Sequence, residues 1–284
     1  MKLKYTLVGL LCLLFMNGCA TGRIKLDAST NKLCLEVLRE GLRSDEFWPS
    51  IHAAEGLTLG GYGREVRAHL EPKLKTEKDD QHRCGLAREL VRAGDKDKLK
   101  IMIGILEGEK DHGHVHAAES LYKVGGAGKI KSMRAAFAQK KNVRLQLMAA
   151  AAMGKAGDAK VMAFLRERMR NEKDPKLYTV VAWILGRIGA ESDIDLIRSR
   201  LADAPDALSK AYLNHAMAAL GDPQGQAALT SNMGSDDPGI RVFAAVFASD
   251  AGMGEVKPQL IKLLRDDTLD VRIRAAQSLL VLSR

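Results

Sequence analysis

The chain has 284 residues, of which 46% are apolar and 28% are charged, and its net charge is +9. This length and composition are those of a globular protein with a substantial core, so a disordered chain is excluded. Aromatic residues make up only 5%, which favours a core of small and aliphatic side chains. The basic balance would suit nucleic acid, an anionic membrane or a polyanionic glycan, and the compartment decides between them.

The N-terminus predicts export. Two lysines within the first four residues precede an apolar run over residues 6–16, which is shorter than the roughly 20 residues that cross a bilayer as a helix. Gly18-Cys19-Ala20 follows and resembles the lipobox of bacterial lipoproteins, although Met16 and Asn17 depart from its usual residues. We expect residues 1–18 to be a lipoprotein signal peptide. The alternative is ordinary cleavage after Ala20, which gives a soluble secreted or periplasmic protein.

The resemblance to lipoproteins implies that Cys19 carries the lipid. Ala20 after that cysteine implies an outer-membrane location facing the periplasm. An exported protein is not expected to meet nucleic acid. Of the cysteines left, Cys34 and Cys84 either pair in an oxidising compartment or stay as buried thiols, and the apolar helical pattern around each favours the second.

Residues 19–43 are expected to form the lipidated tether and an N-terminal capping helix. The helix is predicted over residues 31–42, with Leu33, Val37 and Leu38 facing inward. From residue 44 to residue 284 the chain then repeats itself.

A period of 32 residues runs through this long segment. Three independent columns keep the step: a glycine column (Gly125, Gly157, Gly189, Gly221), an aliphatic column (Met133, Leu165, Ile197, Leu229, Ile261) and an alanine column (Ala118, Ala150, Ala182). Each unit is expected to be helix, tight turn, helix, loop. Such a pair buries its apolar stripes only by stacking on its neighbours.

The residues at the expected helix ends within a unit agree with this pattern. Gly157 suits the left-handed position after a helix, and Asp158 suits the cap of the next one. Asp174-Pro175 and Asp237-Pro238 each look like an N-cap followed by a proline at the first helical position.

Several first helices resemble those of HEAT repeats. The segments are Asp270-Val271-Arg272-Ile273-Arg274-Ala275-Ala276, Asp237-Pro238-Gly239-Ile240-Arg241-Val242 and Asn142-Val143-Arg144-Leu145. The resemblance is closest to the short bacterial type found in bilin lyases. It implies an all-α, right-handed α-solenoid of about seven and a half units over residues 44–284. The final helix, residues 269–282, has no second helix after it, so we expect it either to cap the solenoid or to dock a partner.

The histidines supply a hypothesis of metal binding. His52 and His116 stand in identical His-Ala-Ala-Glu segments, and His112, His116 and Glu119 would share one helix face. Deoxyhypusine hydroxylase, an enzyme family with HEAT architecture, holds iron with His-Glu dipeptides, and none occurs here. The competing interpretation is that these histidines pack at the helix surface, so no cofactor is predicted.

A basic ladder supplies the candidate partner-binding stripe. Arg134, Arg166, Arg198 and Lys262 keep the 32-residue phase on the second helix of their units, which we expect to line the concave wall. Solvated cations late in a helix would give the same pattern.

We therefore expect a non-catalytic protein-interaction scaffold or assembly factor, lipid-anchored in the bacterial envelope, with a protein as its partner. The alternatives are a metal-binding protein or metal-dependent enzyme built on the histidines, and a binder of anionic glycans through the basic ladder.

Overall fold

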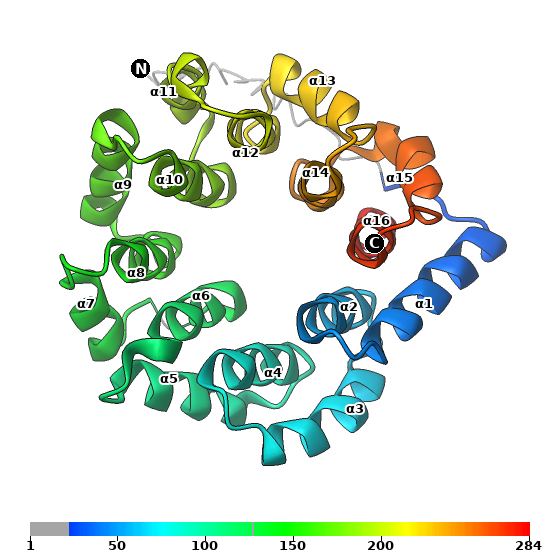
Figure 1. Ribbon diagram of the computed structural model, residues 1–284, viewed down its shortest axis with the longest axis horizontal. Coiled ribbons are helices and arrows are strands. Elements are labelled where there is room, and N and C mark those ends of the chain that lie inside the picture. Colours follow the sequence, from blue (N-terminus) through cyan, green and yellow to red (C-terminus); the bar gives the residue numbers. More distant parts are fainter. Residues whose placement is uncertain (1–22, 127) are drawn as a thin grey trace, which may run out of the picture.

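The structure is a computed structural model and describes residues 23–126 and 128–284. The predicted signal peptide and Cys19 lie outside these residues. Throughout the described chain the regular elements are helices, which alternate between an inner and an outer layer (Figure 1). The inner helices are α2 (Phe47–Leu59), α4 (Asp80–Arg92), α6 (His114–Val124), α8 (Val143–Lys155), α10 (Pro175–Ile188), α12 (Ala207–Ala219), α14 (Pro238–Asp250) and α16 (Leu269–Leu282).

The outer helices are shorter on average and lie around them. They are α1 (Ala28–Leu42), α3 (Gly63–Thr76), α5 (Leu99–Glu107), α7 (Lys131–Phe137), α9 (Ala159–Asn171), α11 (Ile194–Arg198), α13 (Pro223–Asn232) and α15 (Lys257–Leu263). The α-solenoid predicted from the 32-residue period is confirmed. None of the helices in the described ranges combines the length and apolar character needed to cross a bilayer.

The solenoid closes into a ring. Each inner helix packs against the next inner helix along the chain, and α16 packs in turn against α2 (Figure 1). The ring therefore has eight inner helices and no open end within the described chain.

The first helix completes the last unit. Helix α1 contacts both α16 and α2, which is the position that α13 takes between α12 and α14. The sequence predicts that this helix caps an N-terminal end. Instead it supplies the outer helix that the final half-unit lacks, with Val37 and Leu38 buried and Leu33 half-buried.

Close contacts hold α1, α2 and α16 together where the ring closes, a junction that we call the seam. The backbone N–H of Ile24 donates to the carbonyl of Leu282 at 3.1 Å, and the Arg284 guanidinium donates to the carbonyl of Gly60 at 2.7 Å. A Cβ placed on Gly41 would lie only 2.6 Å from the Cδ1 of Ile273, so a glycine is needed for α1 and α16 to approach this closely. The sequence left two roles open for α16, a self-formed cap or a docking edge for a partner. In the ring its edge is covered by α1 and α2 of the same chain.

The two faces of the ring carry different turns. Each inner helix leads to an outer helix on one face, through turns such as residues 93–98, 125–130 and 156–158. We call this the proximal face, because residues 23–27 run along it, where Ile24 pairs with the end of α16. The chain returns to the inner layer on the opposite or distal face, through turns such as residues 77–79, 108–113, 138–142 and 172–174.

The helices begin and end at the predicted capping residues. The Asp174 carboxylate accepts from the backbone N–H of Lys176 with Pro175 next to it, and Asp237 caps α14 in the same way. Gly157 has φ +91°, the left-handed conformation expected after α8. The boundaries of the units are therefore set by local sequence.

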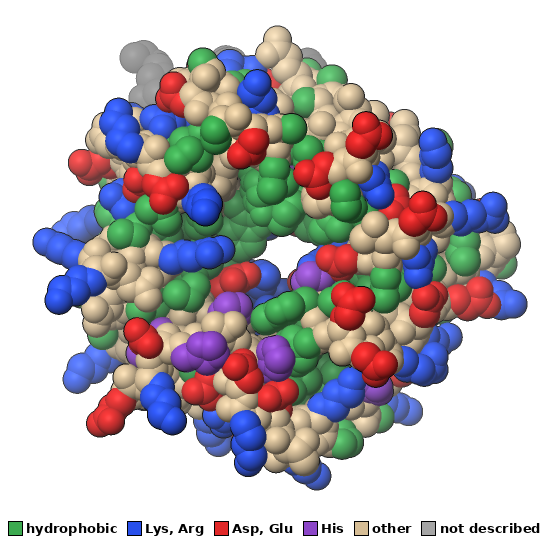
Figure 2. Space-filling model, in the orientation of Figure 1, with side chains coloured by type: hydrophobic (Ala, Val, Ile, Leu, Met, Phe, Trp, Pro, Cys, Tyr) green, Lys and Arg blue, Asp and Glu red, His purple; other side chains and the backbone are tan. Residues whose placement is uncertain are grey.

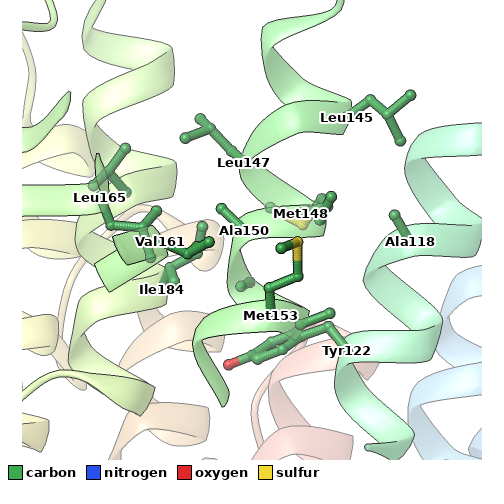
Figure 3. Close-up of a cluster of buried hydrophobic side chains, with 14 of the residues drawn as sticks. Ala118, Tyr122, Leu145, Leu147, Met148, Ala150, Met153, Val161, Leu165 and Ile184 are labelled. Carbon is green, nitrogen blue, oxygen red and sulfur yellow. The ribbon is translucent and has the colours of Figure 1, made fainter. Parts of the chain in front are cut away.

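The core lies between the layers. Ala118, Ala150 and Ala182 are each 0% exposed, which confirms the small-residue column. Figure 3 shows Ala150 on α8 pointing towards Val161 on α9 and Ile184 on α10. A side chain larger than alanine has no room there without moving a helix.

Both remaining cysteines are buried free thiols, Cys34 on α1 and Cys84 on α4. Burial raises the pKa of each thiol to about 12. This agrees with the packed-thiol interpretation.

Candidate functional site

The ring encloses a central opening with two unlike halves. Figure 2 shows histidine and charged side chains gathered on one side of the opening and hydrophobic side chains on the other. The charged half comes from α16, α2, α4 and α6, with Glu55, Arg92 and Glu119 among its residues. The hydrophobic half comes from α8, α10, α12 and α14, and includes the half-buried Trp183 of α10.

Ion pairs join neighbouring helices in the charged half. The carboxylate of Glu55 lies 2.7 Å from Arg92 on α4 and 3.0 Å from Arg274 on α16. These two cations hold the pKa of Glu55 well below its usual range, against the effect of burial. Glu55 therefore stays ionised and ties the seam to the next unit.

A second bridge crosses the hydrophobic half. Arg187 on α10 pairs with Asp250 on α14 at 2.6 Å, so it reaches past the intervening α12. Its guanidinium carbon lies 4.4 Å from the ring centre of Trp183 and 4.1 Å from that of Phe247. This arrangement combines an ion pair with two cation–π contacts, which together tie α10 to α14 across α12.

Aromatic and histidine rings stack at the distal rim of the opening. His82 on α4 stacks on Phe47 at 3.7 Å between ring centres, and His116 on α6 stacks on Trp48 at 5.4 Å. Phe47 and Trp48 open α2 and meet edge to face at 5.0 Å. We call these four side chains the aromatic–histidine rim. All four are half-buried, so each presents part of its ring to solvent.

The candidate metal residues are separated by their partners. His52 lies 2.7 Å from the carboxylate of Asp270 across the seam, and His112 lies 2.8 Å from that of Asp79. His112 belongs to the short turn before α6 and not to the helix itself, so it does not share a helix face with His116 as the spacing predicted.

His116 and Glu119 also have different surroundings. Burial lowers the pKa of His116, which keeps its ring neutral against Trp48. Burial of Glu119 is outweighed by the nearby charges of Lys123 and Arg88, and its pKa falls to about 2. Among the described residues, no three His, Cys, Asp or Glu side chains stand together as metal ligands.

The basic ladder lies on the outside of the ring. Arg134, Arg166, Arg198 and Lys262 belong to α7, α9, α11 and α15, all of them outer helices (Figure 1). The expectation that they line the concave wall is wrong. The first helix of each unit faces the centre, because it is the one packed on both neighbouring inner helices.

Two members of the ladder hold units together. Arg166 pairs with Asp193 of the next unit at 2.6 Å, and Arg198 pairs with Asp222 of the unit after it at 2.6 Å. Arg134 and Lys262 are exposed. Two of the four cations of the ladder are thus explained by an ion pair between consecutive units.

Comparison with known proteins agrees with this geometry. Residues 130–214, from the start of α7 into α12, match the family model of HEAT repeats. These residues carry HEAT repeats. Human deoxyhypusine hydroxylase in complex with glycerol is a similar solved structure, at 14% identity and a TM-score of 0.42, with 90% of this chain and 97% of that chain covered. A search of curated proteins finds no match.

The sequence analysis did not identify the aromatic side chains that contact these polar residues. Trp48, which stacks on His116, was not singled out, although it lies four residues before His52 and so one helical turn away. The pair Trp183 and Arg187 has the same four-residue spacing and was also missed. In both cases, an aromatic residue one helical turn from a polar residue of the same helix was the available signal.

Proposed function

We propose that this HEAT-repeat protein is a non-catalytic interaction scaffold or assembly factor of the bacterial envelope, anchored by a lipid on Cys19 at the periplasmic side of the outer membrane. The observation that supports a binding role most directly is the aromatic–histidine rim. It exposes part of four stacked rings on a closed and therefore rigid frame. Half-exposed aromatic side chains on a rigid support bind a protein partner with little loss of conformational entropy.

The polar groups of the opening favour binding over catalysis. Two candidate proton carriers are already engaged: Glu55 with two arginines, and Glu119 with Lys123. A general base has to be available to its substrate, whereas these groups stabilise the ring. The scattered positions of His52, His112 and His116 likewise give no support to the metal-dependent alternative.

The partner class is a protein surface with an exposed apolar or cationic side chain, since both pack well on indole and phenyl rings. The distal rim lies on the face opposite to residues 23–27. A lipid at Cys19 would therefore leave the rim free to meet a partner.

The test is an affinity capture from membranes of the expressing bacterium, followed by titration of the captured protein. We expect Trp48→Ala to weaken binding about thirtyfold, the effect of losing a central aromatic anchor. Leu59→Ala is the matched control, because Leu59 ends the same helix and is 40% exposed on the proximal side. Equal affinities of the two variants, at unchanged melting temperature, would exclude the rim as the binding site.

The anchor is tested separately with Cys19→Ser. This variant should move from the membrane fraction to the soluble periplasmic fraction. A chain that is equally membrane-bound with serine at this position is not held by lipid on Cys19.

A further inference from the structure

The first described residues, 23–27, are held at a defined place on the ring. The Ile24 N–H donates to Leu282 at the end of α16, and the Lys257 ammonium donates to the carbonyl of Lys25 at 2.6 Å. Leu282 ends an inner helix and Lys257 begins an outer one, so both belong to the proximal face. Residues 23–25, at which the described chain begins, therefore lie on this face.

Only a short stretch separates this point from Cys19. Four residues of extended chain reach at most about 14 Å. A lipid on Cys19 would thus hold the proximal face within roughly that distance of the bilayer surface, which is close to the screening length of about 8–10 Å for charges in solution.

Lysines cluster on this face in three consecutive units. The turns over residues 93–100, 125–131 and 155–160 contain seven lysines and three aspartates. Asp95 and Asp97 are paired with Lys98 and Lys100 at 3.1 and 3.2 Å, and Asp158 accepts backbone N–H groups at the start of α9. The remaining lysines, which we call the proximal lysines, are Lys96, Lys129, Lys131, Lys155 and Lys160.

These five lysines are solvent-exposed, and no ion pair joins them to another described residue. The distal turns of the same region, residues 77–80, 108–113, 138–142 and 172–176, contain six lysines and seven acidic residues. In this part of the ring the proximal face therefore carries a net positive charge, whereas the distal face does not.

The lysine cluster and residues 23–27 lie across the ring from each other. The cluster spans the units from α4 to α9, whereas residues 23–27 follow the seam at α15 and α16 (Figure 1). One attachment at each side would lay the ring flat, with the axis of its opening along the membrane normal.

We propose that the proximal face is a membrane-binding surface, which lies on anionic lipid headgroups through its lysines. The inference rests on the proposed lipid anchor for the attachment at the seam. Each lysine near an anionic surface is attracted to it, and five lysines on one face together favour a single orientation of an anchored molecule. The aromatic–histidine rim then points away from the membrane.

The experiment measures lysine acetylation by mass spectrometry. The protein is isolated from membranes, and the mass of its N-terminal peptide reports whether Cys19 is acylated. It is then placed on phosphatidylethanolamine vesicles with or without phosphatidylglycerol. We expect the proximal lysines to react at least about fivefold more slowly when phosphatidylglycerol is present. The distal Lys140, Lys141, Lys173 and Lys176, which are also exposed, should not change.

Two variants of equal charge change sharpen the comparison. Lys129→Glu, Lys131→Glu and Lys160→Glu together should abolish the protection of Lys96 and Lys155. The control carries Lys140→Glu, Lys141→Glu and Lys173→Glu on the distal face, and should keep that protection. Both triples replace exposed side chains, so neither is expected to disturb the fold.

The outcomes separate the two proposals. Acylated Cys19 together with fully reactive proximal lysines leaves the anchor in place and overturns the membrane-binding face. Protected proximal lysines on a chain without lipid support the face and contradict the anchor. Protection of both faces, or loss of protection in both variants, shows a response to net charge alone and also overturns the inference.

Discussion

His215 shows how a single side chain is set by its neighbours in space. It is 0% exposed on α12, and its Nε2 lies 3.0 Å from the side-chain amide of Asn232 on α13. That contact leaves its Nδ1 without a hydrogen-bond partner among the described residues. Burial lowers the pKa of His215 from 6.5 to about 3, because a charged imidazole would lose its hydration there.

The pKa of His215 predicts a loss of stability in acid. The unfolded chain takes up a proton near pH 6.5, whereas the folded chain does so only near pH 3, so the free energy of unfolding falls as the pH drops through this interval. The full effect is up to about 5 kcal/mol. We expect His215→Leu to flatten the dependence of chemical-denaturation midpoints on pH between these limits. A slope that remains as steep in the variant would assign the acid sensitivity to other groups.

The two His-Ala-Ala-Glu segments illustrate the limit of sequence reasoning at this scale. His52 faces Asp270 across the seam, while His116 stacks on Trp48. Glu55 and Glu119 differ in the same way, one held by two arginines and the other by a lysine. Identical local sequences predicted identical helix positions, and the different neighbours come from units far away in the chain.

At the scale of single helices, the breadth of the apolar face distinguishes the two layers. Inner helix α8 buries Leu145 and the whole run from Leu147 to Met153, because it is packed on both sides and from behind. Outer helix α9 buries only the narrow stripe of Val161, Leu165 and Met169. This contrast was present in the sequence. It indicates that the first helix of a unit is the inner one, and would have placed the basic ladder outside.

Packing of neighbouring inner helices depends on the alanine column. We expect Ala150→Glu to lower the free energy of unfolding by about 3 to 5 kcal/mol, since it would bury an unpaired carboxylate where no exposed surface remains. Ala163→Glu on α9 is the matched control, because Ala163 is exposed. Urea denaturation of both variants is the measurement. Equal midpoints would contradict the assignment of Ala150 to the contact between units.

For the whole molecule, the decisive feature is that α1 and α16 form one unit from opposite ends of the described chain. Closure covers the apolar edge that a solenoid otherwise has to cap with polar residues. It also makes the frame around the central opening continuous, so displacement of one unit has to move its neighbours.

Closure predicts that the ring tolerates circular permutation. Ile24 and Leu282 are already hydrogen-bonded at 3.1 Å, so a short glycine linker can join residue 284 to residue 24. New ends would be placed between Gly125 and Gly126, both in a turn of positive φ. We expect this permutant to melt within about 5 °C of the parent chain, as judged by circular dichroism. Deletion of residues 23–42 should instead abolish the cooperative transition, because it exposes α16 and α2. A stable deletion variant would show that α1 is dispensable.

The sequence by itself determined the helical pairs, their 32-residue period, their caps and the buried alanine column, because each depends on residues within one unit or the next. Only the tertiary structure decided that the units curve into a ring, that α1 completes the last of them, and that the histidines have separate partners. Curvature is the sum of small rotations at every contact between units, and these depend on how side chains from neighbouring helices fit together. A pattern within one unit does not determine this total curvature. The contacts across the seam form only when the ring closes.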